Sequence, residues 1–192
     1  MKNKLIRTFL SVPVPMELKK KKNMLFSTFE NCSAKINWVK SNNLHLTLKF
    51  IGYTQESFID KIINAIQPIT NNHAPFNLVV KGTGCFPVPE RPRILWAGVN
   101  GNTNSLMDLV SNIDLALEKL GFPKDKEKIS PHITLARVKY PQKTTPDVKL
   151  FLQSSYDAID FPIDRVQFFS SELLATGAVY SLLKSFPLGE LL

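Results

Sequence analysis

The spacing of apolar residues along the 192-residue chain predicts strands and helices in alternation. Short runs of β-branched and aromatic residues predict strands, and apolar residues three or four positions apart predict helices. The expected strands cover residues 5–12, 36–39, 44–51, 76–81, 93–99, 161–169 and 177–186, with another that begins at 132. Four helices are expected. The first covers about residues 15–30, the second begins at 58 and stops at Pro68, the third begins at a cap at 102–104 and ends at Gly121, and the fourth starts at Thr145. This mixture predicts an α+β fold.

Two of the expected strands carry the same motif, a histidine followed two positions later by a threonine. The copies are His45-Leu46-Thr47-Leu48 and His132-Ile133-Thr134-Leu135. Because side chains alternate along a strand, each histidine shares a face with its threonine, and the apolar residues occupy the other face. Two such strands facing one another would place two imidazoles and two hydroxyls around one small anionic group.

The surroundings of the two motifs indicate an internal duplication. The motifs start at residues 45 and 132, and the Phe-led strands that follow them start at 76 and 161, so both pairs are offset by nearly the same length. A turn and another apolar strand follow in each half. This frame predicts a single bilobal domain over residues 1–192, with two pseudo-symmetric lobes of mostly antiparallel sheet, helices outside, and a central cleft lined by both motifs.

Composition narrows the class of protein only partly. The net charge of +8 and pI of about 9.5 favour a polyanionic partner, although ordinary surface lysines give the same totals. The run Lys19 to Lys22 is a solvated helix face in the simpler interpretation and a phosphate contact in the alternative. No apolar run is long enough to span a membrane, the N-terminus lacks signal-peptide features, and Cys32 and Cys85 are isolated. We therefore expect a cytoplasmic protein with reduced thiols and no membrane partner.

The paired motif is suited to phosphoryl chemistry. Imidazole has an unperturbed pKa of about 6.5, so one ring can deprotonate a nucleophile while another protonates a leaving oxygen. Threonine hydroxyls beside them can donate to phosphate oxygens. The third histidine, His73, lies in a turn-like segment, and no carboxylates cluster near either motif. The sequence therefore predicts no metal.

A phosphate site also needs positive charge. The candidates are Arg7, Lys49, Arg91, Arg93 and Arg137. Lys49 lies an even number of residues from His45 and could face the cleft. Arg137 lies an odd number of residues from His132, so it reaches the cleft only if the strand has a bulge or ends there.

Each residue in these patterns also has a structural interpretation. A single His-x-Thr strand is more often structural than catalytic, but two copies at matching places in a duplicated frame are far less expected by chance. For Trp38, Trp96 and Phe86 we expect core packing. Stacking of Phe86 on a nucleic-acid base is the alternative.

With these motifs, the sequence resembles the RNA 2′,3′-cyclic phosphodiesterases, once named RNA 2′-5′ ligases, of the two-histidine phosphoesterase superfamily. The resemblance covers nearly the whole chain. The segments that carry it are Arg7-Thr8-Phe9 with Pro13-Val14-Pro15, Asn43 to Gly52, Phe86-Pro87, Arg91 to Trp96, Pro131 to Arg137, and Ser170 to Leu173 with Gly177 and Tyr180.

The resemblance implies a bilobal two-histidine phosphoesterase fold that hydrolyses RNA 2′,3′-cyclic phosphate ends to 2′-phosphomonoesters without a cofactor. It implies that His132 activates water and His45 protonates the departing 3′ oxygen, with the order of these roles left open. Thr47, Thr134 and Arg137 would hold the phosphate, and Arg7, Arg93 and Phe86 are further substrate-binding candidates. RNA ends or small cyclic nucleotides are the expected partners, and we expect a monomer.

Two alternatives remain open. Another enzyme on the same scaffold could act as a reversible 2′-5′ RNA ligase or as a phosphodiesterase for small cyclic nucleotides or ADP-ribose cyclic phosphate. A basic RNA-binding module without catalysis would belong to a different class, and it would show steeply salt-dependent binding with no product.

Overall fold

The computed structural model describes residues 4–124, 130–175 and 177–189. Its strands are β1 (Leu5–Pro13), β2 (Ile36–Trp38), β3 (His45–Gln55), β4 (Phe76–Phe86), β5 (Ile94–Gly101), β6 (His132–Val138), β7 (Ile159–Ile163), β8 (Arg165–Leu174) and β9 (Gly177–Pro187). Its helices are α1 (Met16–Ser27), α2 (Ile59–Asn71), α3 (Thr103–Lys119) and α4 (Lys149–Leu152), with 3-10 turns at Ser41–Asn43 and Glu56–Phe58.

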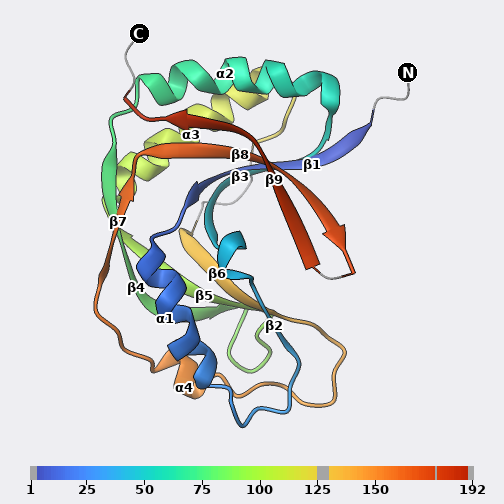
Figure 1. The fold of residues 1–192 in the computed structure, drawn as a ribbon, viewed down its shortest axis with the longest axis vertical. Coiled ribbons are helices and arrows are strands. Elements are labelled where there is room, and N and C mark those ends of the chain that lie inside the picture. The colour runs from blue at the N-terminus through green and yellow to red at the C-terminus, as the bar shows by residue number, and fades with distance from the viewer. Residues whose placement is uncertain (1–3, 125–129, 176, 190–192) are drawn as a thin grey trace.

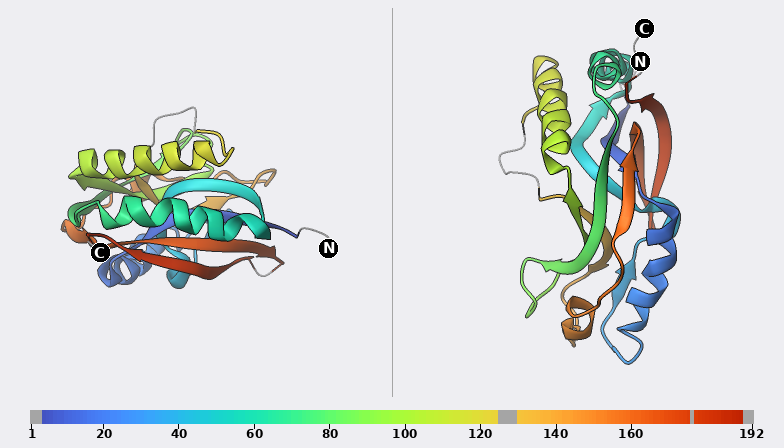
Figure 2. Two further views of the ribbon diagram at one scale, coloured as in Figure 1. Left: turned by 90° about the horizontal axis from the view of Figure 1, so that it is seen from above. Right: turned by 90° about the vertical axis from the view of Figure 1, so that its left-hand side faces the viewer.

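All nine strands belong to one curled antiparallel sheet (Figure 1). The strand order is β7-β4-β5-β6-β3-β1-β8-β9, and β2 pairs with the remaining part of β6. The motif strands β6 and β3 meet in the middle, so the sheet consists of two lobes of four strands on either side of their junction. Helices α2 and α3 lie together at one end of the molecule, and α1 and α4 lie at the other (Figures 1 and 2). The predicted bilobal α+β fold is confirmed.

The two lobes do not correspond to the two halves of the chain. The first half supplies β1 and β3 to one lobe, but its next strand, β4, pairs with β5 and β7 in the other lobe. The second half supplies β6 and β7 to that lobe, and its β8 crosses back to pair with β1. Each half therefore contributes strands to both lobes, which ties the lobes into one sheet.

Several predicted boundaries are wrong for local reasons. Gly52 does not end β3, because it adopts a φ of +87° at a bulge and the strand continues to Gln55. Pro68 does not stop α2, because the buried face of that helix continues beyond it to Thr70. The segment at Thr145 forms only the short α4, whose first turn is capped by the Asp147 carboxylate. The stretch 161–169 is two strands that pair with different neighbours.

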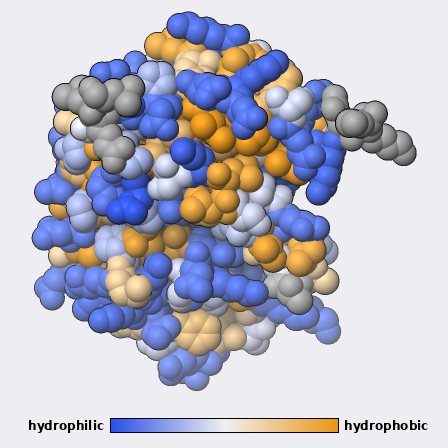
Figure 3. Space-filling model, turned by 45° about the horizontal axis from the view of Figure 1, so that its top comes forward, coloured by the Kyte–Doolittle hydropathy of each residue, from blue (hydrophilic) through white to orange (hydrophobic). Residues whose placement is uncertain are grey.

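The core lies between the sheet and its helices. Helix α3 buries one continuous face, as its apolar spacing predicts, and Asn102 caps it by accepting a hydrogen bond from the backbone of Ser105. Among the described helices, none is long and apolar enough to cross a membrane. On the face shown in Figure 3, apolar side chains gather in patches between polar ones.

Candidate active site

The two motifs meet where β3 and β6 touch. Leu46 and Ile133, the middle residues of the motifs, pair in antiparallel register and are both buried. In this register the residues flanking the pair lie across from one another, so His45 faces Thr134 and Thr47 faces His132. The fold thus brings both histidines and both threonines to one face of the sheet, as the sequence predicts.

This face forms the wall of a cavity of about 540 Å³ at the junction of the lobes. Its polar and charged lining includes both motifs and two arginines, namely His45, Thr47, His132, Thr134, Arg7 and Arg137. Phe9, Phe50 and Tyr180 add an aromatic wall on the His45 side. The cavity therefore combines a cationic, hydrogen-bonding floor with a surface on which a planar group could stack.

Both histidines are oriented in the same way. The Nδ1 atom of His45 lies 2.7 Å from the carbonyl oxygen of Asn43, and Nδ1 of His132 lies 2.8 Å from that of Ser130. A carbonyl can only accept a hydrogen bond, so each Nδ1 must carry a proton and donate. The Nε2 atom is then the one that exchanges protons, as an acceptor in the neutral ring and a donor in the imidazolium.

The ring of His45 is packed among aromatic side chains. Its centroid lies 4.9 Å from that of Phe9 and 5.5 Å from that of Tyr180. Burial lowers the pKa of His45, and the charge of Arg137 lowers it further, although the hydrogen bond to Asn43 opposes these effects. Burial raises the pKa of Tyr180, so its phenol keeps its proton near neutral pH and can act as a donor. His45 is therefore neutral at pH 7 before any anion binds.

The ring of His132 is supported on the other lobe by Phe86 and Trp96. Phe86 packs edge-on against it at 5.1 Å between centroids, and Trp96 lies 6.4 Å away. Phe86 was expected to pack in the core, with contact to the substrate as the alternative, and it is not among the described residues that line the cavity. Its contact with His132 makes it a residue that positions the imidazole.

A bulge at the same place in each motif decides which cations face the cavity. On β3, Thr47 pairs with Ser11 and Lys49 with Leu10, which leaves Leu48 as an extra residue. On β6, Leu135 is extra in the same way between Thr134 and Ala136. Each bulge reverses the alternation beyond it. Arg137 consequently lines the cavity, because the bulge compensates for its odd spacing from His132.

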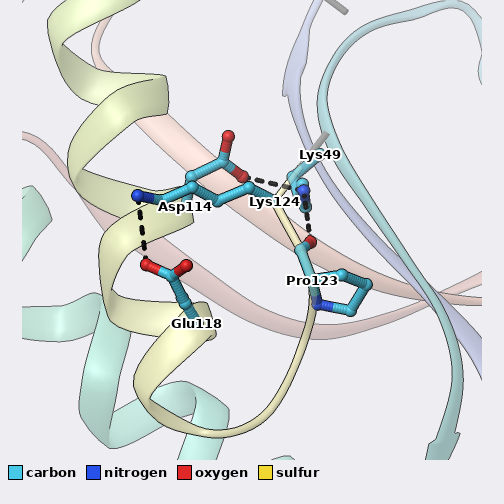
Figure 4. Close-up of polar contacts among 5 residues, drawn as sticks. All are labelled: Lys49, Asp114, Glu118, Pro123 and Lys124. Atoms are coloured by element: carbon cyan, nitrogen blue, oxygen red, sulfur yellow. Dashed lines mark hydrogen bonds and ion pairs between the residues drawn. The ribbon is translucent and has the colours of Figure 1, made fainter. Parts of the chain in front are cut away.

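The bulge in β3 also shows that the expectation of Lys49 facing the cavity is wrong. Beyond the Leu48 bulge, Lys49 points away from the cavity and is 2% exposed. Its Nζ forms an ion pair of 2.9 Å with Asp114 of α3 and donates to the carbonyl oxygen of Pro123 at 3.0 Å (Figure 4). Lys49 therefore links the motif strand to α3, and Phe50 takes the next position toward the cavity.

The other cationic candidates separate into two groups. Arg7 on β1 lines the cavity. Arg93 does not appear among the described lining residues, and its guanidinium lies 5.7 Å from the centroid of the Tyr140 ring, beside Arg91 at 5.2 Å. These two arginines form a separate cationic group at the start of β5.

The cavity residues that the sequence reasoning missed include three aromatic ones, Phe9, Phe50 and Tyr180. Phe9 and Tyr180 belong to segments that carry the family resemblance, but no site role was predicted for either of them. Phe50 stands in its bulged strand where Arg137 stands in the other, so an alignment of the two motifs could have identified it. In the described part of the chain, no group of three or more His, Cys, Asp or Glu side chains is arranged to hold a metal ion.

Comparison with known proteins agrees with this geometry. The sequence profile of the family described as LigT like phosphoesterase matches residues 12–96 and again residues 98–180. The RNA 2′,3′-cyclic phosphodiesterase of Thermotoga maritima is 35% identical over 179 residues, which cover 93% of each chain. TT0787 of Thermus thermophilus has a similar structure, with a TM-score of 0.81 at 26% identity over 96% of this chain and 98% of that one. Escherichia coli LigT complexed with 3′-AMP shares the fold at a TM-score of 0.74 and 19% identity, covering 96% of this chain and 99% of that one.

Two His-x-Thr strands facing one cavity across a duplicated, curled antiparallel sheet define a two-histidine phosphoesterase. Within that class, the chain belongs to the LigT-like phosphoesterase family, whose profile matches it twice, once for each duplicated unit.

Proposed function

We propose that this protein hydrolyses RNA 2′,3′-cyclic phosphate ends to 2′-phosphomonoesters by acid–base catalysis without a metal ion. The observation that carries the proposal is the matched anchoring of His45 and His132, each of which donates Nδ1–H to a backbone carbonyl. This anchoring assigns Nε2 of both rings to proton transfer at one cavity. The curated relative from Thermotoga maritima, which has the same activity in its name, supports the choice of substrate.

In the proposed reaction, the two histidines act on opposite sides of the phosphorus. His132 Nε2 takes a proton from water as the water oxygen forms its bond to phosphorus. The bond from phosphorus to the 3′ oxygen breaks, and His45 Nε2 gives that oxygen a proton. The products are a 2′-phosphomonoester and a 3′ hydroxyl. Each transfer is expected to contribute roughly 10²- to 10⁴-fold to the rate.

Neutral side chains and one arginine balance the charge of the phosphate. The hydroxyls of Thr47 and Thr134 can donate to the nonbridging oxygens, and Arg137 offers a guanidinium from the same face. Burial lowers the pKa of His45, and the charge of Arg137 lowers it further. The negative charge of a bound phosphate favours the imidazolium against both effects, so we expect His45 to gain its catalytic proton as the substrate binds.

The aromatic wall favours a substrate that carries a base. Phe50 is 58% exposed and lines the cavity beside Phe9 and Tyr180, although a phenylalanine gains nothing from exposure to water. Stacking of a nucleobase on an exposed aromatic ring typically contributes about 1–3 kcal/mol. We therefore place the base of the terminal nucleotide on the His45 side of the cavity.

The test is incubation of the protein with an oligonucleotide ending in a 2′,3′-cyclic phosphate, with and without EDTA, followed by ³¹P NMR assignment of the product. We expect a 2′-phosphomonoester at equal rates in both samples. A 3′-phosphate product, or activity lost to EDTA, would contradict the mechanism. Salt-dependent RNA binding with no product would instead identify a noncatalytic RNA-binding module, and joining of a 5′-hydroxyl RNA strand would identify a ligase.

A further inference from the structure

A second cavity, of about 370 Å³, lies beside the active site on the His132 lobe. The residues of its lining that matter here are Lys81, Trp96, Gly98, Asn100 and Ser130. None of these residues lines the first cavity. The second cavity is therefore a separate depression, and the reaction proposed above leaves it without a role.

The strand register places this cavity next to the catalytic group. Gly98 on β5 pairs with His132 on β6, and Trp96 pairs with Thr134. Paired residues project on the same side of a sheet, so the second cavity opens on the same face as the first. Neighbouring strands are about 4.8 Å apart, which puts β5 one spacing and β4 about two spacings from His132. A nucleotide adjoining one bound at His132 could reach this position.

The floor of the cavity is shaped by an indole ring and two glycines. The Trp96 ring occupies the space that a side chain at Gly84 would fill, because a Cβ there would lie 2.0 Å from its Cζ2 atom. At Gly98 a Cβ would lie 2.6 Å from the carbonyl oxygen of Lys81. The absence of side chains at both positions leaves the indole lying across the strands beside His132, which is a suitable surface for a base.

The far rim is polar and held in place. Residues Lys81 and Gly82 form a bulge in β4, since Val80 pairs with Val99 and the next paired residue of β4 is Thr83, opposite Ala97. The bulge is fixed from both sides: Asn100 Nδ2 donates to the Lys81 carbonyl at 3.4 Å, and the Tyr156 hydroxyl donates to the Gly82 carbonyl at 2.8 Å. This arrangement presents an exposed lysine at the edge of the cavity.

We propose that the second cavity is a subsite for the nucleotide that precedes the cyclic phosphate end, which makes an RNA oligonucleotide the preferred substrate over a cyclic mononucleotide. Trp96 stacks on the base of that nucleotide, and the Lys81 ammonium pairs with the phosphodiester that links it to the terminal nucleotide. Asn100 and Ser130 offer hydrogen-bonding groups for its ribose or base. The proposal rests on the proposed function and adds a binding site for a second nucleotide.

The experiment compares kcat/KM for 2′,3′-cyclic AMP and for a diadenosine dinucleotide with a 2′,3′-cyclic phosphate end. The variants are Lys81→Met and Asn100→Ala, and the control is Lys184→Met, which removes an exposed lysine of β9 outside both cavities. We expect the wild-type protein to prefer the dinucleotide, and each subsite variant to lose about five- to tenfold on the dinucleotide while its rate on cyclic AMP stays within about twofold. Unchanged turnover of cyclic AMP also shows that the variants are folded.

Salt dependence gives a second readout for Lys81. A charge interaction between a lysine and a phosphate at the surface is screened by salt. We expect kcat/KM for the dinucleotide to be less sensitive to salt in Lys81→Met than in the wild-type protein, whereas Lys184→Met leaves this sensitivity unchanged.

Two results would overturn the subsite. One is equal wild-type kcat/KM for both substrates, and the other is a loss in Lys81→Met that is the same for cyclic AMP and the dinucleotide. Loss of the dinucleotide preference in Arg91→Met but not in Lys81→Met would place the RNA strand along the arginines at Tyr140 instead. Failure of the proposed function is distinct, because the wild-type protein would then turn over neither substrate.

Discussion

Leu48 in β3 and Leu135 in β6 are both the extra residue of a β-bulge, each placed directly after the threonine of its motif. The bulges change which side chains reach the cavity. In one lobe the bulge sends Lys49 into the protein interior, and in the other it brings Arg137 to the cavity. A symmetric frame therefore carries an asymmetric site, with an arginine on one side and Phe50 on the other.

This asymmetry predicts different effects for two arginines that are close in the fold. Arg137→Met should lower kcat/KM for a cyclic-phosphate oligonucleotide by about 10- to 100-fold, because a hydrogen bond to a charged group is worth about 1.5–3 kcal/mol. Arg93→Met removes a guanidinium that lies over Tyr140 rather than in the cavity, so we expect a loss below about threefold. Steady-state kinetics on both variants measures the two losses of kcat/KM. Equal losses would show that the cavity does not define the phosphate site.

The two histidines that we propose as catalytic can be compared with a third that serves as a control. His45→Ala and His132→Ala should each reduce kcat by at least about 100-fold, since each removes one proton transfer. His73 binds backbone carbonyls of Ala74 and Ser105 through its two ring nitrogens, so His73→Ala should keep full kcat. Circular dichroism melting curves would show that the first two variants remain folded. Normal turnover by either of them would refute the division of labour.

Much of this site could be predicted from the sequence because its pattern is local. The period-two spacing of His45 and Thr47, repeated at His132 and Thr134, places each pair on one face in any strand. The duplicated frame then predicts that the two faces meet. The pairing of Leu46 with Ile133 at the junction of the lobes confirms that prediction.

The features that could not be predicted depend on long-range pairing. The placement of β4 and β8 in the lobe opposite to the motif strand of their own half depends on pairing between strands far apart in the sequence, which the periodicity of apolar residues does not record. The direction of Lys49 depends on a bulge that is visible only against its partner strand β1. The role of Phe86 depends on its contact with His132, a residue far away in the chain.

The environment of His45 predicts a pH dependence of stability. Burial lowers the pKa of His45 in the folded protein, whereas the unfolded chain titrates near 6.5. Below pH 6.5 the unfolded state therefore binds a proton that the folded state refuses, and the free energy of unfolding falls with decreasing pH until the pH passes the folded pKa. Urea titrations between pH 7.5 and 5 should show a weaker pH dependence for His45→Gln than for the wild type. An identical dependence in both would mean that folding does not lower the pKa of His45.

The buried ion pair behind the motif predicts an unequal effect of removing its two partners. Lys49 is 2% exposed and Asp114 is 16% exposed, so Asp114→Asn leaves a positive charge enclosed by protein, whereas Lys49→Met leaves a carboxylate that still reaches water. Asp114→Asn removes one of the charged contacts of the buried ammonium, and we expect it to lower the free energy of unfolding by about 1.5–3 kcal/mol. For Lys49→Met we expect a smaller loss, about 0.5–1.5 kcal/mol.

The control for these variants comes from the same helix. Glu118 pairs with Lys124 at 3.0 Å, but both side chains are about half exposed (Figure 4). Glu118→Gln should therefore cost less than about 1 kcal/mol. Replacing both buried partners with apolar residues, as in Lys49→Met with Asp114→Leu, should recover much of the loss of Asp114→Asn, because the buried ammonium is removed together with its carboxylate partner. Urea denaturation of the four proteins measures all of these differences. If Asp114→Asn were no less stable than Glu118→Gln, the ion pair would not be what fastens β3 to α3.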